Sequence, residues 1–146
     1  MLDKSKKITI NSTPALSGSV EGRALVSDEP LSFWGGIDPE TGNIIDTRHQ
    51  RCGESIKDKI FVFPNGRGSS TSSAILLECI RNGTAPAAII NSQIDQTFVL
   101  GSVVADELYG KSVPVFIVAE TDFAQFKDGA LLSLQPDGTI IQSVIQ

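Results

Sequence analysis

The residues with the clearest chemical potential form one short segment, 63–73, where a glycine-rich turn precedes a run of hydroxyl side chains. The turn contains Gly66, Arg67 and Gly68, and residues 69–73 are all serine or threonine. The first N–H groups of a helix lack partners within the helix, and the helix dipole places partial positive charge there. Glycines allow close backbone approach, while arginine and hydroxyl groups donate hydrogen bonds, so the segment predicts a carboxylate or phosphate site.

Two observations bear on that interpretation. The lysine and the spacing of a nucleotide-binding P-loop are absent, and so is a Gly-x-Gly-x-x-Gly pattern. Serine and threonine at a helix start are also ordinary caps, and capping is the alternative role for Ser70 and Thr71. A run of 5 hydroxyl residues nevertheless exceeds what one cap uses.

Other reactive side chains are few, with 1 His and 2 Cys in the whole chain. These numbers exclude a zinc site or a four-cysteine iron–sulfur cluster built from this chain alone, and they give no disulfide framework. A Ser-His-Asp hydrolase would have to use His49, which lies in a polar stretch and is expected to be an exposed loop residue. We expect Cys79 to pack in the core and Cys52 to lie in a loop.

The elements that must position these residues change character near residue 58. The first part has short apolar segments broken by glycine and proline, with a turn signal in which Asp38 and Thr41 are turn formers. The second part alternates apolar runs with helical spacing, which predicts β-α-β-α-β units within a layered α/β fold. The predicted strands are 8–10, 20–26, 32–34, 43–46, 59–63, 87–90, 113–118, 130–134 and 139–145, and the predicted helices lie near 72–82 and 100–110.

Composition fits this picture. The chain has 146 residues, 40% hydrophobic and 20% charged, which predicts a single globular domain spanning 1–146. The net charge of −5 disfavours a nucleic-acid surface, which needs basic residues. No segment has the ~20 consecutive apolar residues of a membrane span, and no signal peptide is recognisable. We therefore expect a soluble cytoplasmic protein with no membrane partner.

Gly66-Arg67-Gly68-Ser69-Ser70 resembles the Gly-x-Gly-Ser-Ser turn of the swivel domain in aconitase-type dehydratases. Three further blocks, 33–42, 53–56 and 82–88, resemble the small subunit of aconitase X. The similarity runs from about Gly18 to Phe123, and the spacing of the blocks makes it specific. One departure from aconitase proper is Thr71, which stands where that enzyme has an arginine that binds substrate carboxylate, a difference that aconitase X members generally share.

The resemblance implies a three-layer β/β/α swivelling domain that closes over a separate large subunit. It implies that Ser69 is the catalytic base and that Arg67, Gly68, Ser70 and Thr71 bind substrate. It also implies that the large subunit, and not this chain, holds the iron or iron–sulfur cluster.

The implied reaction is removal of water from a small hydroxylated acid. Residues 66–73 and the helix around Val103–Tyr109 resemble the bacterial members of the family that act on cis-3-hydroxy-L-proline, which would give pyrroline-2-carboxylate. Mevalonate 5-phosphate is the alternative substrate. A stand-alone module that binds small anions, or a purely structural interaction domain, is the alternative without catalysis.

Overall fold

The computed structural model describes residues 5–66 and 71–145. In this part of the chain, one 8-stranded mixed sheet has the strand order β1-β8-β7-β3-β4-β5-β6-β2. The strands are β1 (Ser5–Asn11), β2 (Thr13–Leu16), β3 (Val20–Val26), β4 (Ile60–Val62), β5 (Ala88–Asn91), β6 (Val115–Ile117), β7 (Leu131–Leu134) and β8 (Thr139–Ile145). The helices are α1 (Thr71–Asn82), α2 (Gln96–Tyr109) and the short α3 (Glu120–Phe123).

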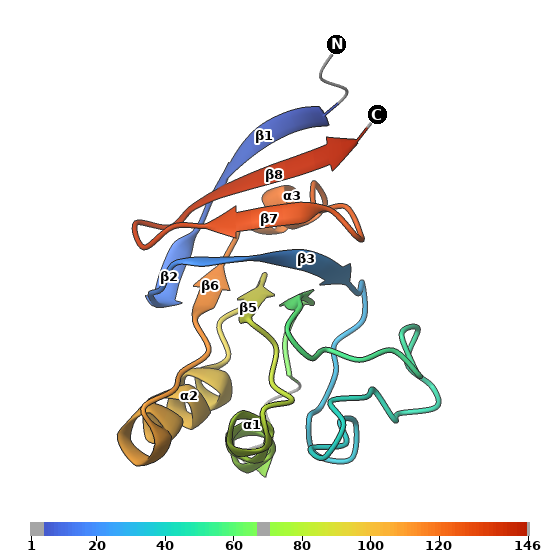
Figure 1. Cartoon of the computed structure of the whole chain (residues 1–146). Coiled ribbons are helices and arrows are strands. Elements are labelled where there is room, and N and C mark those ends of the chain that lie inside the picture. The colour runs from blue at the N-terminus through green and yellow to red at the C-terminus, as the bar shows by residue number, and fades with distance from the viewer. Residues whose placement is uncertain (1–4, 67–70, 146) are drawn as a thin grey trace.

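The sheet has a parallel half and an antiparallel half that share β3 (Figure 1). Strands β3, β4, β5 and β6 run parallel, whereas β7, β8 and β1 pair antiparallel beyond β3. The edge strands β1 and β2 are separated in the chain by Ser12 alone, whose N–H donates to Gly138 O at 3.0 Å. Because consecutive residues supply both edges, the sheet must curl, and it forms a half-barrel.

Two hydrophobic cores lie on opposite faces of the parallel strands. In β4, Phe61 belongs to the core shared with the helices, while Ile60 and Val62 belong to the core between the two halves of the sheet. Ile89 and Ile90 of β5 divide in the same way, because successive side chains of a strand point to opposite faces. The layers are therefore β, β and α, as the resemblance implied. Burial on both faces also explains why these strands read as unbroken apolar runs.

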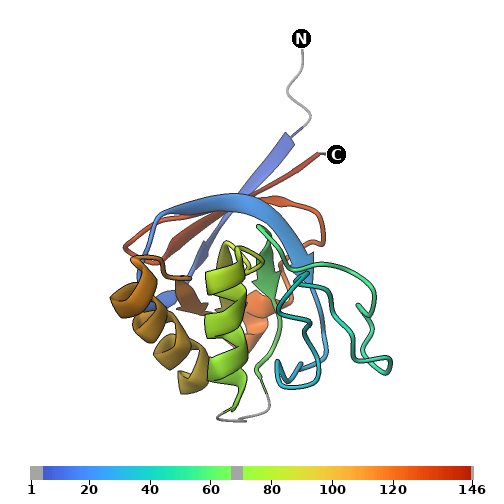
Figure 2. The ribbon, with the colours of Figure 1, turned by 60° about the horizontal axis from the view of Figure 1, so that its bottom comes forward.

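Both long helices cover the same face of the parallel strands and lie side by side (Figures 1 and 2). In α1, the buried residues Ser72, Leu76, Cys79 and Ile80 have the predicted helical spacing. The helices approach closely at Gly101, where a Cβ atom would lie 2.8 Å from the backbone oxygen of Ser73. Contact between the helices therefore begins in the first turn of α1.

The predicted strands 32–34 and 43–46 are wrong. The chain there forms turns, with isolated bridges between Ile37 and Ile44 and between Asn43 and Ser55. The reason is a reversal at Gly35 and Gly36: Gly35 has φ 75°, and a Cβ on Gly36 would lie 2.1 Å from the Ser32 oxygen. Phe33, Ile37 and Ile44 are still buried and reach the core from a looped backbone, whereas Trp34 and Ile45 are exposed.

The other predicted elements are confirmed to within a few residues, including the hairpin of β7 and β8. Strand β2 and helix α3 were not predicted. Pro14 obscures β2, and it is tolerated because β2 lies at the edge of the sheet. In the described residues no helix has the length and apolar character that crossing a membrane requires.

Candidate active site

The carboxyl ends of the parallel strands gather the segments that surround the predicted site. Because β3, β4 and β5 run in the same direction, the residues after Val26, Val62 and Asn91 emerge at one edge of the sheet. Such an edge is where ligands bind in open α/β sheets. The segment after β4 leads through Gly66 to α1, which begins at Thr71.

Most of the predicted site residues fall outside the described part of the chain. Arg67, Gly68, the proposed base Ser69 and Ser70 lie in the segment 67–70, between the described residues 66 and 71. Thr71 is described, and it is the exposed first residue of α1. The first turn of α1 has no acidic side chain, so nothing there offsets the partial positive charge of the helix start.

The described residue before that segment, Gly66, is held tightly. Its N–H donates to Oδ2 of Asp95 at 2.9 Å, and a Cβ atom at this position would lie 2.5 Å from Cζ of Phe98. The neighbouring Asn65 side chain donates from Nδ2 to Oε1 of Gln93 at 2.8 Å. The segment between β5 and α2 therefore contacts the chain that leads out of β4.

On the other side of the segment 67–70, Ser72 anchors the start of α1. This side chain is fully buried, and its Oγ accepts a hydrogen bond from the backbone N–H of Trp34 at 3.4 Å. The indole of Trp34 itself is 61% exposed. The block 33–42, singled out by resemblance, thus touches the start of α1.

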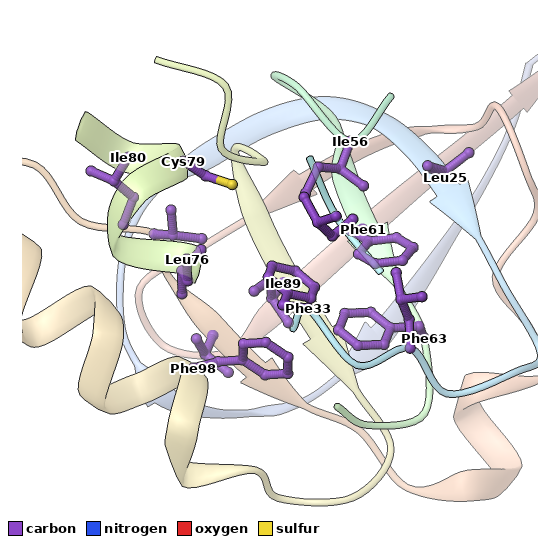
Figure 3. Packing of buried hydrophobic residues seen from close by; sticks show 14 of the residues in the cluster. Leu25, Phe33, Ile56, Phe61, Phe63, Leu76, Cys79, Ile80, Ile89 and Phe98 are labelled. Carbon is purple, nitrogen blue, oxygen red and sulfur yellow. The ribbon is translucent and has the colours of Figure 1, made fainter. Parts of the chain in front are cut away.

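A ring cluster lies beneath these contacts (Figure 3). Phe98 of α2 lies 4.8 Å from Phe33 and 5.5 Å from Phe63, measured between ring centroids, and all three are fully buried. Phe33 is next to Trp34, Phe63 directly follows the last residue of β4, and Phe98 lies in the first turn of α2. The cluster fixes the three segments that meet at the candidate site.

Sequence reasoning missed Asp95 and gave no special role to Ser72. Asp95 precedes α2 as its N-cap, and an aspartate directly before an amphipathic run is a recognised signal for that position. The contact between Asp95 and Gly66 spans 29 residues and has no local signal.

The prediction that His49 is an exposed loop residue is wrong, because its side chain is only 6% exposed. Its Nε2 lies 3.0 Å from Oγ of Ser27, and its Nδ1 accepts the N–H of Arg51 at 3.1 Å. In the neutral ring Nε2 then carries the hydrogen and donates it, which is the wrong arrangement for removing a proton from Ser27. His49 therefore ties the loop 46–53 to the end of β3.

Asp38 and Thr41 form a turn, as predicted. Asp38 accepts from the Glu40 N–H at 3.0 Å and from the Thr41 hydroxyl at 3.1 Å. Gly42 closes the turn with φ 78°. Their hydrogen bonds are used within the turn itself.

The cysteines and acidic residues do not fit an iron–sulfur cluster. Across residues 5–66 and 71–145 no group of three or more His, Cys, Asp and Glu side chains could hold a metal ion. Cys79 is buried as predicted, and this burial raises its pKa to about 11, whereas a cluster ligand must be a thiolate. Cys52 is exposed in a loop.

Comparison with known proteins identifies the family of this chain. A model of the aconitase X swivel domain matches residues 9–143. The chain belongs to the aconitase X swivel-domain family. The crystal structure of Thermococcus kodakaraensis aconitase X in its holo form aligns with a TM-score of 0.82 and 32% identity, covering 92% of this chain and 98% of that chain.

The relatives of this chain include two kinds of dehydratase. The phosphomevalonate dehydratase small subunit of Methanopyrus kandleri is 38% identical over 122 residues, which is 83% of this chain and 86% of that subunit. The cis-3-hydroxy-L-proline dehydratases of Hypocrea jecorina and Pseudomonas aeruginosa are each 42% identical. The match to these two covers 77% and 72% of this chain, but only 19% and 18% of their length. The swivel domain is thus a small part of those longer proteins.

Proposed function

We propose that this chain is the small subunit of an aconitase X-type hydro-lyase, which dehydrates a small hydroxylated acid together with a large subunit. The observation that carries the proposal is the swivel-domain match over residues 9–143, since the named relatives of both kinds are dehydratases. The fold agrees, because the described residues on both sides of the segment 67–70 belong to the end of β4 and the start of α1, at the carboxyl ends of the parallel strands.

In this proposal Ser69 accepts the proton. Dehydration removes a proton from the carbon beside the carboxyl group and hydroxide from the next carbon, which leaves a double bond between them. The proton goes to the Ser69 alkoxide, and the C–O bond breaks with its electron pair on the departing hydroxide. The proton on Ser69 then passes to this hydroxide, directly or through solvent, which gives one water and restores the alkoxide. The hydroxyl of a free serine is too weak an acid for this role at neutral pH, so its anion must be stabilised. The start of α1, without acidic residues, and Arg67 supply that stabilisation.

Substrate binding is assigned to Arg67, Gly68, Ser70 and Thr71. Exposed at the first position of α1, Thr71 can donate its hydroxyl to a carboxylate or phosphate oxygen. We place the iron or iron–sulfur cluster on the large subunit, because the described residues of this chain do not offer a ligand set for it.

We propose cis-3-hydroxy-L-proline as the substrate and pyrroline-2-carboxylate as the product, on the basis of the 42% identity to two dehydratases of that substrate. One observation favours mevalonate 5-phosphate instead. The chain covers 86% of the Methanopyrus kandleri phosphomevalonate dehydratase small subunit at 38% identity. Both substrates are therefore assayed.

The test begins with co-expression of this chain and a candidate aconitase X large subunit, sought in the neighbouring reading frames. The copurified complex is assayed on both substrates, and its iron is determined. We expect dehydration by the complex and none by this chain alone. If the chain alone bound phosphate in calorimetry and recruited no large subunit, the alternative of a stand-alone anion-binding module would replace the proposal.

Replacement of Ser69 tests the assignment of the base. Ser69→Ala is expected to lower turnover by about 10²–10⁴-fold, the range for loss of a general base, while the complex still assembles. The matched control is Ser133→Ala on β7, a half-buried serine remote from α1. Near-normal turnover in the Ser69→Ala complex would remove the base from Ser69.

A further inference from the structure

Asp95 is the one acidic side chain among the described residues that is buried, with 7% of it exposed. A carboxyl group in such a place needs hydrogen-bond donors around it. Asp95 has donors at both oxygens: Oδ1 accepts the N–H of Thr97 at 3.0 Å and its hydroxyl at 2.5 Å, and Oδ2 accepts the N–H of Gly66 at 2.9 Å. The two oxygens therefore serve different segments of the chain.

The first oxygen has an ordinary task. Through Oδ1, Asp95 caps α2 by satisfying an N–H of the first turn. A serine or threonine, with one oxygen, would cap as well. Capping therefore leaves Oδ2 and its contact with Gly66 without an explanation.

The second oxygen holds the point from which the chain leaves β4 for the segment 67–70. Gly66 is buried between this oxygen and the Phe98 ring, and a Cβ atom here would lie 2.8 Å from Oδ2 and 2.5 Å from Cζ. Phe98 is itself fixed against Phe33 and Phe63. Gly66 is thus confined by a hydrogen bond on one side and by packing on the other.

We propose that Asp95 is a positioning residue for the proposed dehydration, because it tethers Gly66, which precedes Ser69 by three residues, to the start of α2. The inference rests on the function proposed above, because it takes Ser69 as the base. Ser72 and Trp34 form the corresponding contact on the other side of the segment 67–70. Both described flanks of that segment are thus anchored to neighbouring parts of the fold.

Asp95→Ser separates the tether from the cap. Serine keeps one oxygen for the Thr97 N–H and has none left for Gly66, whereas Asp95→Ala removes both contacts. The matched control is Asp106→Ser, the same change at an exposed position of α2.

Amide hydrogen exchange of the full-length chain, measured by NMR, tests the hydrogen bond between Asp95 and Gly66 independently of catalytic activity. In Asp95→Ser we expect exchange of the Gly66 N–H to accelerate by about tenfold or more, while the Thr97 N–H stays within about threefold of wild type. In Asp95→Ala both should accelerate. Unchanged exchange at Gly66 in Asp95→Ser would overturn the tether.

The turnover of the reconstituted complex measures the effect of the tether on catalysis. A misplacement of about 1 Å costs about 10²-fold in rate, so we expect kcat to fall by about 10–100-fold in both Asp95 variants, with KM changed by less than about threefold. A role in capping alone would instead leave Asp95→Ser close to wild type and lower only Asp95→Ala. That pattern, or an unchanged kcat in both, would overturn the positioning role.

These results distinguish the two proposals. If Ser69→Ala kept its turnover while Asp95→Ser lowered kcat, the base would be elsewhere and the positioning role would stand. A complex without dehydratase activity would count against the proposed function, and the exchange of Gly66 would still decide whether the tether exists.

Discussion

Replacing Gly66 by alanine should destabilise the fold, chiefly through a clash with the Phe98 ring and also through a contact of 2.8 Å with Oδ2 of Asp95. The new Cβ would lie 2.5 Å from Cζ and 2.7 Å from Cε2 of Phe98. Carbon atoms pack best at about 3.5–4.0 Å, so the ring would have to retreat by about 1 Å. Phe33 and Phe63 block that retreat, with ring centroids 4.8 Å and 5.5 Å from that of Phe98. Overpacking of a core costs about 1–3 kcal/mol, and the confined ring favours the upper part, about 2–3 kcal/mol.

A second variant tests whether the ring is the cause. Phe98→Leu removes the atoms that clash, and alone it should cost about 1–2 kcal/mol as a change of shape in the core. In the double variant the two costs should not add, because the alanine finds space where the ring was. We expect a coupling of about 1–2 kcal/mol in favour of the double variant.

The assay is urea unfolding of the full-length chain, followed by far-ultraviolet circular dichroism. The control is Gly22→Ala on β3, where a Cβ atom would meet Ile60 Cγ1 at an ordinary 3.4 Å. This change should alter the free energy of unfolding by less than about 1 kcal/mol. If Gly66→Ala were as mild as the control, or if the double variant were additive within about 0.5 kcal/mol, the rigid contact at Gly66 would be refuted.

Three further outcomes follow from the buried polar groups. A thiol reagent near neutral pH should modify Cys52 and spare Cys79, whose pKa burial raises to about 11; equal labelling of both would contradict the burial of Cys79. The pKa of the Cys79 thiol is about 9.0 in the unfolded chain and about 11 in the folded one, so the free energy of unfolding should fall as the pH rises across that interval. The fall should be steeper than in Cys79→Ala, and parallel pH curves for the two proteins would exclude the thiol as the cause. His49→Ala should cost about 1–3 kcal/mol in urea unfolding, because it strips a hydrogen-bond partner from buried Ser27. Arg48→Ala removes a side chain that is 91% exposed and should leave the free energy of unfolding almost unchanged. A loss just as small in His49→Ala would contradict the stabilising role of the His49 contact.

The parallel strands could be predicted because their cause is local. Residues of β4 and β5 are buried on both faces, so the sequence there is apolar except at Asn91, the last residue of β5. The same rule failed at 32–34, where Phe33 is buried, Trp34 is exposed, and the reversal at Gly35 and Gly36 keeps the backbone out of the sheet. An apolar run predicts a strand only where the turns beside it leave the backbone extended.

The surroundings of the candidate site could be predicted less well, because its contacts join distant segments. His49 is polar and lies in a polar stretch, and its burial depends on Ser27, 22 residues earlier. Asp95 reaches back 29 residues to Gly66. The hydroxyl run after Gly68 could be recognised from the sequence because it lies in one stretch, whereas the residues that hold its flanks do not.

The arrangement explains how a small domain can hold the two described flanks of the segment 67–70. A reacting group must be held within about 0.5 Å of its productive position by neighbours that are themselves fixed. Here the fixed neighbours are three phenylalanine rings, each a few residues from an anchor: Phe33 beside Trp34, Phe63 before Gly66 and Phe98 after Asp95. The anchors are hydrogen bonds, which supply direction, and the rings supply the rigidity that hydrogen bonds alone lack. Loosening either part should therefore impair the proton removal that we propose for Ser69, while leaving the distant hairpin of β7 and β8 intact.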